Sequence, residues 1–159
     1  MAVVLRDATI DDVERLIPIW YDGWQDAHAS IVPEALVRLR TVENLRSRMP
    51  AMIPQMRVAE LDGRPVGFCV LKGDELDQLY VAFDARGAGV AQALIEDAEA
   101  RLRAVGVETA WLACAIGNDR AARFYEKSGW TRARTITIPL GTDGAPVPLD
   151  VWRYEKRLR

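Results

Sequence analysis

Apolar side chains return every three to four positions in several segments of the chain, which is the spacing of a helix with one buried face. The long segments are residues 13–28, 33–49 and 90–105, and a shorter one follows at residues 120–127. Pro18 lies inside the first segment and is expected to kink or break that helix. The pattern therefore predicts three long helices and one short helix.

Strand-like runs occupy most of the remaining sequence, and their order predicts the fold class. They are residues 3–6, 55–61, 65–71, 75–81, 108–116, 130–140 and 147–156. Asp62-Gly63 is a strong hairpin signal between the second and third runs. The helix at residues 90–105 joins the fourth run to the fifth, and such a crossover places its two strands in parallel. We expect an α/β protein with an α+β mixed sheet, mostly antiparallel, with one parallel βαβ crossover.

Length and composition limit the functions that the chain can have. With 159 residues it fits one domain, residues 1–159, which can form a core without disulfides or metal. The net charge of −2 and the lack of a basic block give no support for a nucleic-acid partner, and none is expected. No apolar run reaches membrane-spanning length and no signal-peptide pattern is present, so we expect no membrane contact and a cytoplasmic location.

Cysteine and histidine usage gives no support for a metal site. Cys69 and Cys114 lie in apolar strand-like runs without CxxC spacing, which is typical of buried free thiols. His28 is the only histidine in the sequence, which excludes a His-rich metal centre. We therefore expect no metal in this protein.

A glycine-rich turn at residues 84–89 separates the strand that ends at residue 81 from the helix that begins at residue 90. Free N–H groups and the helix dipole attract anions to such a helix N-terminus. Gly87 and Gly89 carry no side chain that would keep a phosphate away from the backbone. The turn therefore predicts an anion site, with more than one candidate ligand.

Four interpretations of this turn compete. A Walker A loop requires a lysine after the glycines, and none follows them here. A Rossmann fingerprint requires a third glycine at the position that Gln92 occupies. The third interpretation is a cradle of backbone N–H groups for the pyrophosphate of coenzyme A. The fourth is a tight strand-to-helix turn that binds nothing.

Two segments carry motif patterns that bear on this choice. Residues 86–91, RGAGVA, fit the pattern Q/R-x-x-G-x-G/A, and residues 118–130 fit the pattern N-x-x-A-x-x-F/L-Y-x-x-x-G-F/W. Both patterns belong to the GNAT superfamily of acyl-CoA-dependent N-acetyltransferases, which the chain also resembles in its predicted order of elements. The resemblance implies a GNAT-like fold with helices on both faces of the sheet, and acetyl-CoA (coenzyme A) as the cofactor without a metal.

The resemblance also implies how the matched positions hold acetyl-CoA. Main-chain groups that bind the pyrophosphate would be those of Arg86, Gly87, Gly89, Val90 and Ala91, with the Arg86 side chain as an optional partner. Leu79 and Val81 would pair their backbone with the pantetheine arm, which requires an open strand edge. Asn118 would contact the cofactor arm or a substrate amide, and it also fits a helix N-cap.

Acetyl transfer by direct attack of a neutral amine requires a proton acceptor for the amine and a proton donor for the departing thiolate. Tyr125 matches the family's tyrosine that protonates the coenzyme A sulfur; otherwise it is an aromatic residue packed under the sheet. Glu75 matches the glutamate that some relatives use as the base, and Asp77 lies on the same face of that strand. Either carboxylate could instead be a solvated charge at a strand end.

Substrate contacts in the family come from the first two helices. Candidates in that region are Trp20, Tyr21, Trp24, His28 and Glu34, and Asp77 adds to them from the strand. Trp20 and Trp24 also fit a core stripe at helical spacing, which is the favoured interpretation for Trp20. The Gly/Pro/Asp loop at residues 141–148 is a second candidate lip of the amine site.

The resulting hypothesis is an enzyme, a GNAT-type N-acetyltransferase that acetylates a primary amine of a small molecule or peptide. The alternative is a non-catalytic module of the same fold that binds acyl-CoA as a sensor or regulator. The residues do not distinguish antibiotic, polyamine, amino-acid and protein N-terminal acceptors. Because family members are often dimers, a homodimer is one state that the resemblance suggests.

Overall fold

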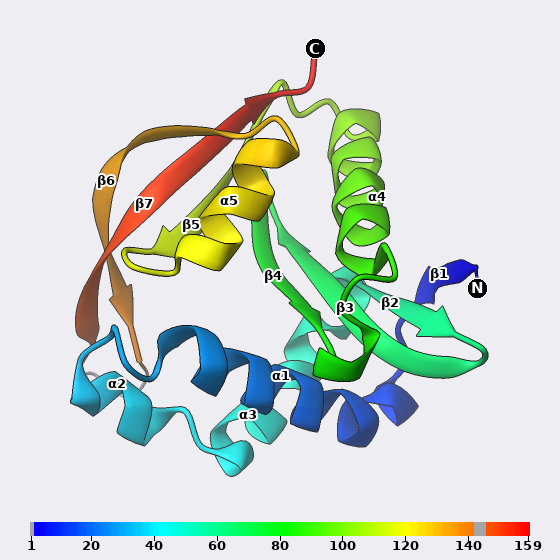
Figure 1. Cartoon of the computed structure of the whole chain (residues 1–159), viewed down its shortest axis with the longest axis horizontal. Coiled ribbons are helices and arrows are strands. Elements are labelled where there is room, and N and C mark those ends of the chain that lie inside the picture. The colour runs from blue at the N-terminus through cyan, green and yellow to red at the C-terminus, as the bar shows by residue number, and fades with distance from the viewer. Residues whose placement is uncertain (1, 142–145) are drawn as a thin grey trace.

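A seven-stranded sheet forms the centre of the computed structural model, which describes residues 2–141 and 146–159 (Figure 1). Its order is β1-β2-β3-β4-β5-β7-β6, and neighbours are antiparallel except for β4 and β5, which are parallel. The strands are β1 (Val3–Asp7), β2 (Met56–Leu61), β3 (Arg64–Lys72), β4 (Glu75–Val81), β5 (Thr109–Ala115), β6 (Thr131–Leu140) and β7 (Val147–Arg157). The predicted mixed sheet with one parallel crossover is confirmed.

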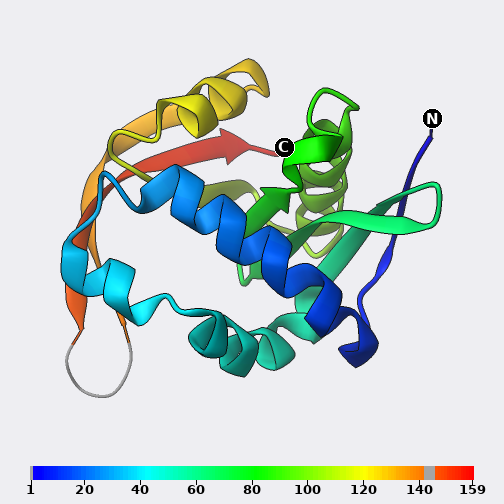
Figure 2. The same cartoon turned by 60° about the horizontal axis from the view of Figure 1, so that its bottom comes forward.

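Helices cover both faces of this sheet (Figures 1 and 2). One face carries α1 (Val13–His28), α2 (Glu34–Leu39) and α3 (Val42–Arg48), and the other carries α4 (Val90–Ala104) and α5 (Asp119–Lys127). Short 3-10 segments lie at Ile10–Asp12, Met49–Gln55 and Phe83–Ala85. None of the helices in the described part of the chain is both long and apolar enough to cross a membrane.

Each face of the sheet has its own apolar core. Phe68 of β3 packs with Trp20 of α1 on one face, at a ring centroid distance of 6.1 Å. Its neighbour Cys69 points to the other face, where it joins the buried residues of α4, because side chains alternate along a strand. Cys69 and Cys114 are buried free thiols, as the sequence predicted.

The helical pattern over residues 33–49 forms two helices, so the prediction of one continuous helix is wrong. Arg40 leaves the helical conformation, with φ −89° and ψ 63°, and ends α2. Thr41 then begins α3 as its N-cap, because its hydroxyl accepts a hydrogen bond from the Asn44 N–H at 3.0 Å. Apolar spacing survives such a break, and so the periodicity does not reveal it.

Pro18 does not end its helix, although a break was one of the expected effects. The helix α1 runs from Val13 to His28 through this residue. Pro18 removes the hydrogen bond to the Glu14 carbonyl, but Glu14 is exposed, and water can satisfy that group.

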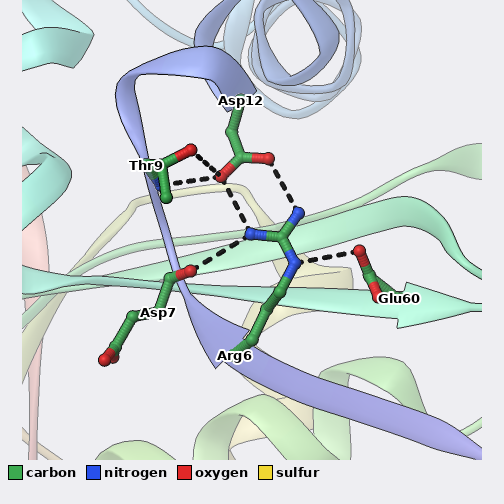
Figure 3. Close-up of polar contacts among 5 residues, drawn as sticks. All are labelled: Arg6, Asp7, Thr9, Asp12 and Glu60. Atoms are coloured by element: carbon green, nitrogen blue, oxygen red, sulfur yellow. Dashed lines mark hydrogen bonds and ion pairs between the residues drawn. The ribbon is translucent and has the colours of Figure 1, made fainter.

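A polar network fixes the start of α1 to the sheet (Figure 3). The Arg6 guanidinium of β1 donates to the Asp12 carboxylate at 2.8 and 2.9 Å, and to Glu60 of β2 at 2.9 Å. Asp12 also accepts a hydrogen bond from the Thr9 N–H at 2.7 Å. Because Asp12 immediately precedes α1, these contacts set where the helix leaves the sheet.

Candidate active site

The parallel strands β4 and β5 separate soon after they meet (Figure 1). Within the described residues their ladder consists of the single pair Glu75–Trp111, supported by a hydrogen bond from the Trp111 N–H to the Asp74 carbonyl at 3.2 Å. A cavity of about 630 Å³ lies beyond that point, lined by residues of α1, β4, β5, α5 and the loop before α4. This volume is in the range of small-molecule and cofactor sites.

The backbone of β4 faces this cavity with unpaired polar groups. The Ala82 N–H donates to Val66 of β3 at 2.7 Å, so alternate residues of the strand direct their N–H and C=O groups to the other edge. Leu79 and Val81 are those residues, and both line the cavity. An extended chain with amide groups can therefore pair with β4 as a further strand would.

The glycine-rich loop forms one end of the same cavity. Gly87 and Gly89 have φ values of +84° and +82°, a conformation that residues with a side chain rarely adopt. Gly89 is the N-cap of α4, and no side chain in the described part of the chain caps this helix. The first-turn N–H groups at Val90 and Ala91 thus remain available to an anion, and both residues line the cavity.

The side chain of Arg86 is held to one side of the loop. It lies 3.4 Å from the Asp26 carboxylate of α1, and its guanidinium is 4.4 Å from the centre of the Phe83 ring. Arg86 still lines the cavity. In this arrangement the side chain of Arg86 is engaged by Asp26 and Phe83, and the residue contributes its main chain to the glycine-rich turn.

The N-cap of α5 and one residue of that helix also line the cavity. Asn118 is the N-cap of α5, where its side chain accepts a hydrogen bond from the Ala121 N–H at 3.4 Å. Tyr125 lies near the end of α5. Its ring packs against those of Phe124, Trp130 and Tyr154, with centroid distances of 5.5, 6.4 and 6.1 Å. Burial raises the pKa of the Tyr125 hydroxyl well above its usual value, so it stays protonated at neutral pH.

A second cavity of about 150 Å³ adjoins the first on the side of α1, α2 and α3. Glu75, Asp77 and Trp24 line it, and His28, Asp77 and Tyr80 line both cavities. Burial, with a smaller effect from the nearby Asp77 charge, raises the pKa of Glu75 to about 7. A carboxylate that titrates near neutral pH is suited to exchange a proton with an amine.

The His28 ring packs against Trp24 and lies within hydrogen-bond distance of the main chain of α1. Its Nδ1 lies 3.1 Å from the Trp24 carbonyl oxygen, which fits a protonated Nδ1 that donates, and its ring is 5.1 Å from the Trp24 ring. Burial lowers the pKa of His28, so the ring is neutral at physiological pH.

Two of the sequence candidates, Tyr21 and Glu34, line neither cavity in the described part of the chain. Glu34 is exposed at the start of α2, where its carboxylate pairs with Arg38 at 3.1 Å. The predicted loop at residues 141–148 includes residues 142–145, which lie outside the described residues. Leu140 and Leu149, which flank that loop, line the second cavity.

Sequence reasoning missed several cavity residues, and a signal for some of them was present. Tyr80 lies between the matched positions Leu79 and Val81, and burial raises the pKa of its hydroxyl. A Cβ on Gly23 of α1 would be 2.6 Å from the Tyr80 ring, so only glycine lets the two elements approach this closely. Arg40 and Arg48 line the second cavity, and the apolar pattern gave no signal for either of them.

Several N-acetyltransferases are similar to this chain in sequence or in fold. The peptidyl-lysine N-acetyltransferase YjaB of Escherichia coli is 28% identical over 130 residues, which cover 82% of this chain and 83% of YjaB. An uncharacterized N-acetyltransferase of Mycobacterium bovis is 36% identical over 118 residues, or 71% of this chain and 73% of that protein. The crystal structure of the PaiA N-acetyltransferase from Thermoplasma acidophilum, in complex with coenzyme A, superposes with a TM-score of 0.69 at 20% identity and covers 99% of both chains.

A family model agrees with these relatives over most of the sequence. The model of the acetyltransferase (GNAT) family matches residues 16–130, which include β4, the glycine-rich loop, α4 and α5. That range also contains both segments in which the sequence resembled the family. The chain therefore belongs to the GNAT family of acetyltransferases.

Proposed function

We propose that this protein transfers the acetyl group of acetyl-CoA to a primary amine of a small molecule or peptide. The observation that carries the proposal is the separation of β4 from β5, which brings an unpaired strand edge, an uncapped helix N-terminus and Tyr125 to one cavity. Acetyl-CoA supplies the acetyl group as a thioester.

The residues of the first cavity fit the chemical parts of coenzyme A. The N–H groups after Gly87 and Gly89 suit the pyrophosphate, since charge-assisted hydrogen bonds to an anion are about twice as strong as neutral ones. The free backbone groups of Leu79 and Val81 suit the amides of the pantetheine arm. Asn118, at the far wall, is within the same cavity and is available to that arm.

Tyr125 is proposed as the proton donor. As the amine nitrogen bonds to the carbonyl carbon, the bond from that carbon to sulfur breaks, and the Tyr125 hydroxyl donates a proton to the departing thiolate. A donor must hold its proton until this step, and burial of the hydroxyl favours the protonated form. The resulting tyrosinate recovers a proton from solvent before the next turnover.

Glu75 is proposed as the proton acceptor, directly or through water. Its pKa near 7 leaves a large fraction ionised at neutral pH while keeping it basic enough to accept the amine proton. Asp77 and His28 line both cavities, Trp24 lines the second, and all three are proposed to contact the acceptor amine. Glu34, which points away from both cavities, has no part in this proposal.

Two measurements test the proposal. Coenzyme A and acetyl-CoA are expected to raise the melting temperature of the purified protein, and thiol release is expected from acetyl-CoA with at least one member of a broad amine panel. A melting temperature that does not respond to either compound contradicts the cofactor site. A response to coenzyme A without thiol release from any amine supports the alternative, a non-catalytic acyl-CoA sensor.

Tyr125→Phe separates the proposed chemical role of Tyr125 from its packing. The change keeps the aromatic ring against Trp130 and Tyr154 and removes only the hydroxyl. Loss of a positioned acid typically lowers the rate about 100-fold or more, so kcat is expected to fall by that factor while the Kd for coenzyme A stays within about twofold. Tyr154→Phe, which removes the hydroxyl of a neighbouring ring that lines neither cavity and bonds to Glu126 and Arg132, is the control. Equal kcat in Tyr125→Phe and wild type rules out the acid role.

A further inference from the structure

Two arginines at the second cavity lack the ion pairs that their neighbours make. Arg38 pairs with Glu34 at 3.1 Å, and Arg46 pairs with Glu14 at 2.9 Å. Arg40, with 6% of its surface exposed, and Arg48 both line the cavity, and no carboxylate of residues 2–141 and 146–159 forms an ion pair with either. A buried guanidinium without a counter-ion is unfavourable, so the pair needs an explanation.

Hydrogen-bond donors at this wall also outnumber their acceptors. Among the described residues, Arg40 makes one long side-chain hydrogen bond, from Nη1 to the Asn44 Oδ1 at 3.4 Å, although a guanidinium carries five N–H donors. The guanidinium of Arg48 lies 5.0 Å from the centre of the Trp20 ring. The indole N–H of Trp20 is buried and has no acceptor in the part of the chain that the structure describes. Three neighbouring residues thus offer donors to an absent acceptor.

The charge of both arginines persists at neutral pH. Burial, and the like charge of Arg48, lower the pKa of Arg40 to about 10, which leaves it protonated. Burial also lowers the pKa of Arg48, and the Asp77 charge opposes that effect. The wall is therefore cationic: Asp77 partly offsets the charge of Arg48, but no carboxylate of the described residues forms an ion pair with either arginine.

The opposite wall of the same cavity is acidic. Glu75 and Asp77 line it, yet neither carboxylate forms an ion pair with Arg40 or Arg48 within the described residues. The cavity therefore separates a cationic wall from an acidic wall that adjoins the proposed site of acetyl transfer. A ligand with an anion at one end and an amine at the other matches both walls.

We infer that the acceptor is a small amino carboxylate, an inference that rests on the proposed function. Its carboxylate binds Arg40 and Arg48, and its amine faces Glu75 and Asp77. Guanidinium groups recognise oxyanions through charge-assisted and bidentate hydrogen bonds, and the Trp20 N–H adds one neutral donor. The cavity volume of about 150 Å³ is below the roughly 300–1,000 Å³ of sites for drug-sized ligands, which favours a small acceptor over a folded protein surface.

Matched acceptors test the inference. Thiol release from acetyl-CoA is measured with the wild-type protein for each L-amino acid and for its primary amide, which keeps the amine and side chain but lacks the carboxylate. For the best amino acid, kcat/KM is expected to exceed that of its amide by roughly tenfold or more, the usual effect of losing a charge-assisted hydrogen bond. A polyamine and a lysine-containing neutral peptide are included, and both are expected to be poorer acceptors.

Arg48→Gln identifies the residues responsible for any such preference. It is expected to raise KM for the amino acid roughly tenfold and to leave KM for the amide within about twofold. Arg46→Gln is the control, because Arg46 is exposed on the same helix and pairs with Glu14 away from the cavity. The coenzyme A-induced rise in melting temperature shows that each variant is folded. Arg48→Lys keeps the charge but not the planar fork, and it should restore part of the preference.

The outcomes separate this inference from the proposed function. If amides, the polyamine or the neutral peptide react as well as amino acids do, the amino carboxylate is overturned while the acetyltransferase stands. If Arg48→Gln keeps the full preference for the amino acid, the assigned carboxylate site is overturned. If coenzyme A binds and no acceptor releases thiol, the proposed function itself fails. Binding to Arg40 can be checked with Arg40→Gln under the same folding criterion.

Discussion

Glu75 has a raised pKa, from which the pH dependence of both catalysis and stability can be predicted. It lies at the start of β4, in the one pair that joins β4 to β5 within the described residues, and it lines the second cavity. Burial is the main cause of its raised pKa of about 7, and the charge of Asp77 is the next. Both effects disfavour the carboxylate, which makes the ionised form a stronger base.

The first prediction concerns the pH dependence of catalysis. If Glu75 must be ionised to accept the amine proton, kcat/KM rises with pH with a midpoint of about 7. Asp77→Asn is expected to move that midpoint to lower pH, since it removes a negative neighbour. Glu75→Gln is expected to lower kcat about 100-fold and to abolish this midpoint. A midpoint near 7 that persists in Glu75→Gln assigns the titration to another group.

Glu75 also has an expected effect on stability, which provides an independent check. Its folded-state pKa of about 7 is above the ordinary value of 4.5, so the folded protein favours the neutral form. This contribution is fully present below pH 4.5 and is lost as pH rises through about 7. The melting temperature of Glu75→Gln relative to wild type should therefore be higher at pH 8 than at pH 5.

Individual residues differed in how well the sequence could place them. Tyr125 and Asn118 belong to a contiguous motif on one short helix, so their position beside the glycine-rich loop could be predicted. Arg40 and Arg48 could not be placed in this way, because their proximity depends on the break between α2 and α3. Glu34 was a candidate by region alone, and its side chain turns outward to Arg38.

At the scale of the element, the glycine-rich loop depends on backbone conformation more than on side-chain space. A Cβ on Gly89 would meet no atom within 4 Å, but the φ of +82° disfavours any residue with a side chain. Gly63 in the β2–β3 hairpin has the same property, with a φ of +75° and no atom within 4 Å of the added Cβ. The two positions therefore form a matched pair.

This pair provides the prediction at the scale of the element. Gly89→Ala and Gly63→Ala are each expected to lower the free energy of unfolding by about 1–2 kcal/mol, measured by urea denaturation. Gly89→Ala alone is expected to raise the Kd for coenzyme A roughly tenfold, because the strain misaligns the N–H groups at the start of α4. If both variants weaken coenzyme A binding equally, the loop has no special role in that binding.

The elements themselves were largely predictable because each has a strong local signal. The Asp62-Gly63 turn has positive φ at both residues, 51° and 75°, as a two-residue hairpin turn requires. The break at Arg40 and Thr41 had no such signal in the apolar pattern, since Leu36 and Leu45 keep one buried face across it. How far β4 and β5 separate depends on pairing between distant residues, which no local pattern determines.

At the scale of the whole molecule, the Arg6–Asp12–Glu60 contacts join the sheet to the helix that carries Trp24 and His28. Asp12 is 6% exposed, and its carboxylate is fully committed to Arg6 and Thr9. The hydrogen bond from Arg6 lowers the pKa of Asp12. Replacing Asp12 removes two hydrogen bonds of the Arg6 guanidinium near the start of α1.

We expect Asp12→Asn to lower the free energy of unfolding by about 2–3 kcal/mol, because breaking a largely buried ion pair is strongly destabilising. Asp11→Asn, at the exposed neighbouring position, should change it by less than about 0.5 kcal/mol. The native pKa of Asp12 is lowered, so its contribution is present above pH 3.8 and is lost as pH falls through the folded-state value. Urea titrations at neutral and acidic pH measure both effects, and equal losses in the two variants would contradict the network's role.

Because β4 separates from β5, amide hydrogens in the middle of the sheet are expected to exchange with solvent as readily as those of an edge strand. Central strands normally contain the amides that exchange most slowly with deuterated water, because opening them requires global unfolding. Within residues 2–141 and 146–159, the N–H groups of Leu79 and Val81 have no strand partner on that side, and we expect them to exchange far faster than those of β3. Coenzyme A should slow both of them, whereas adenosine diphosphate, which lacks the pantetheine arm, should not. If the amides of Leu79 and Val81 exchange slowly in the protein without coenzyme A, this edge of β4 is already paired.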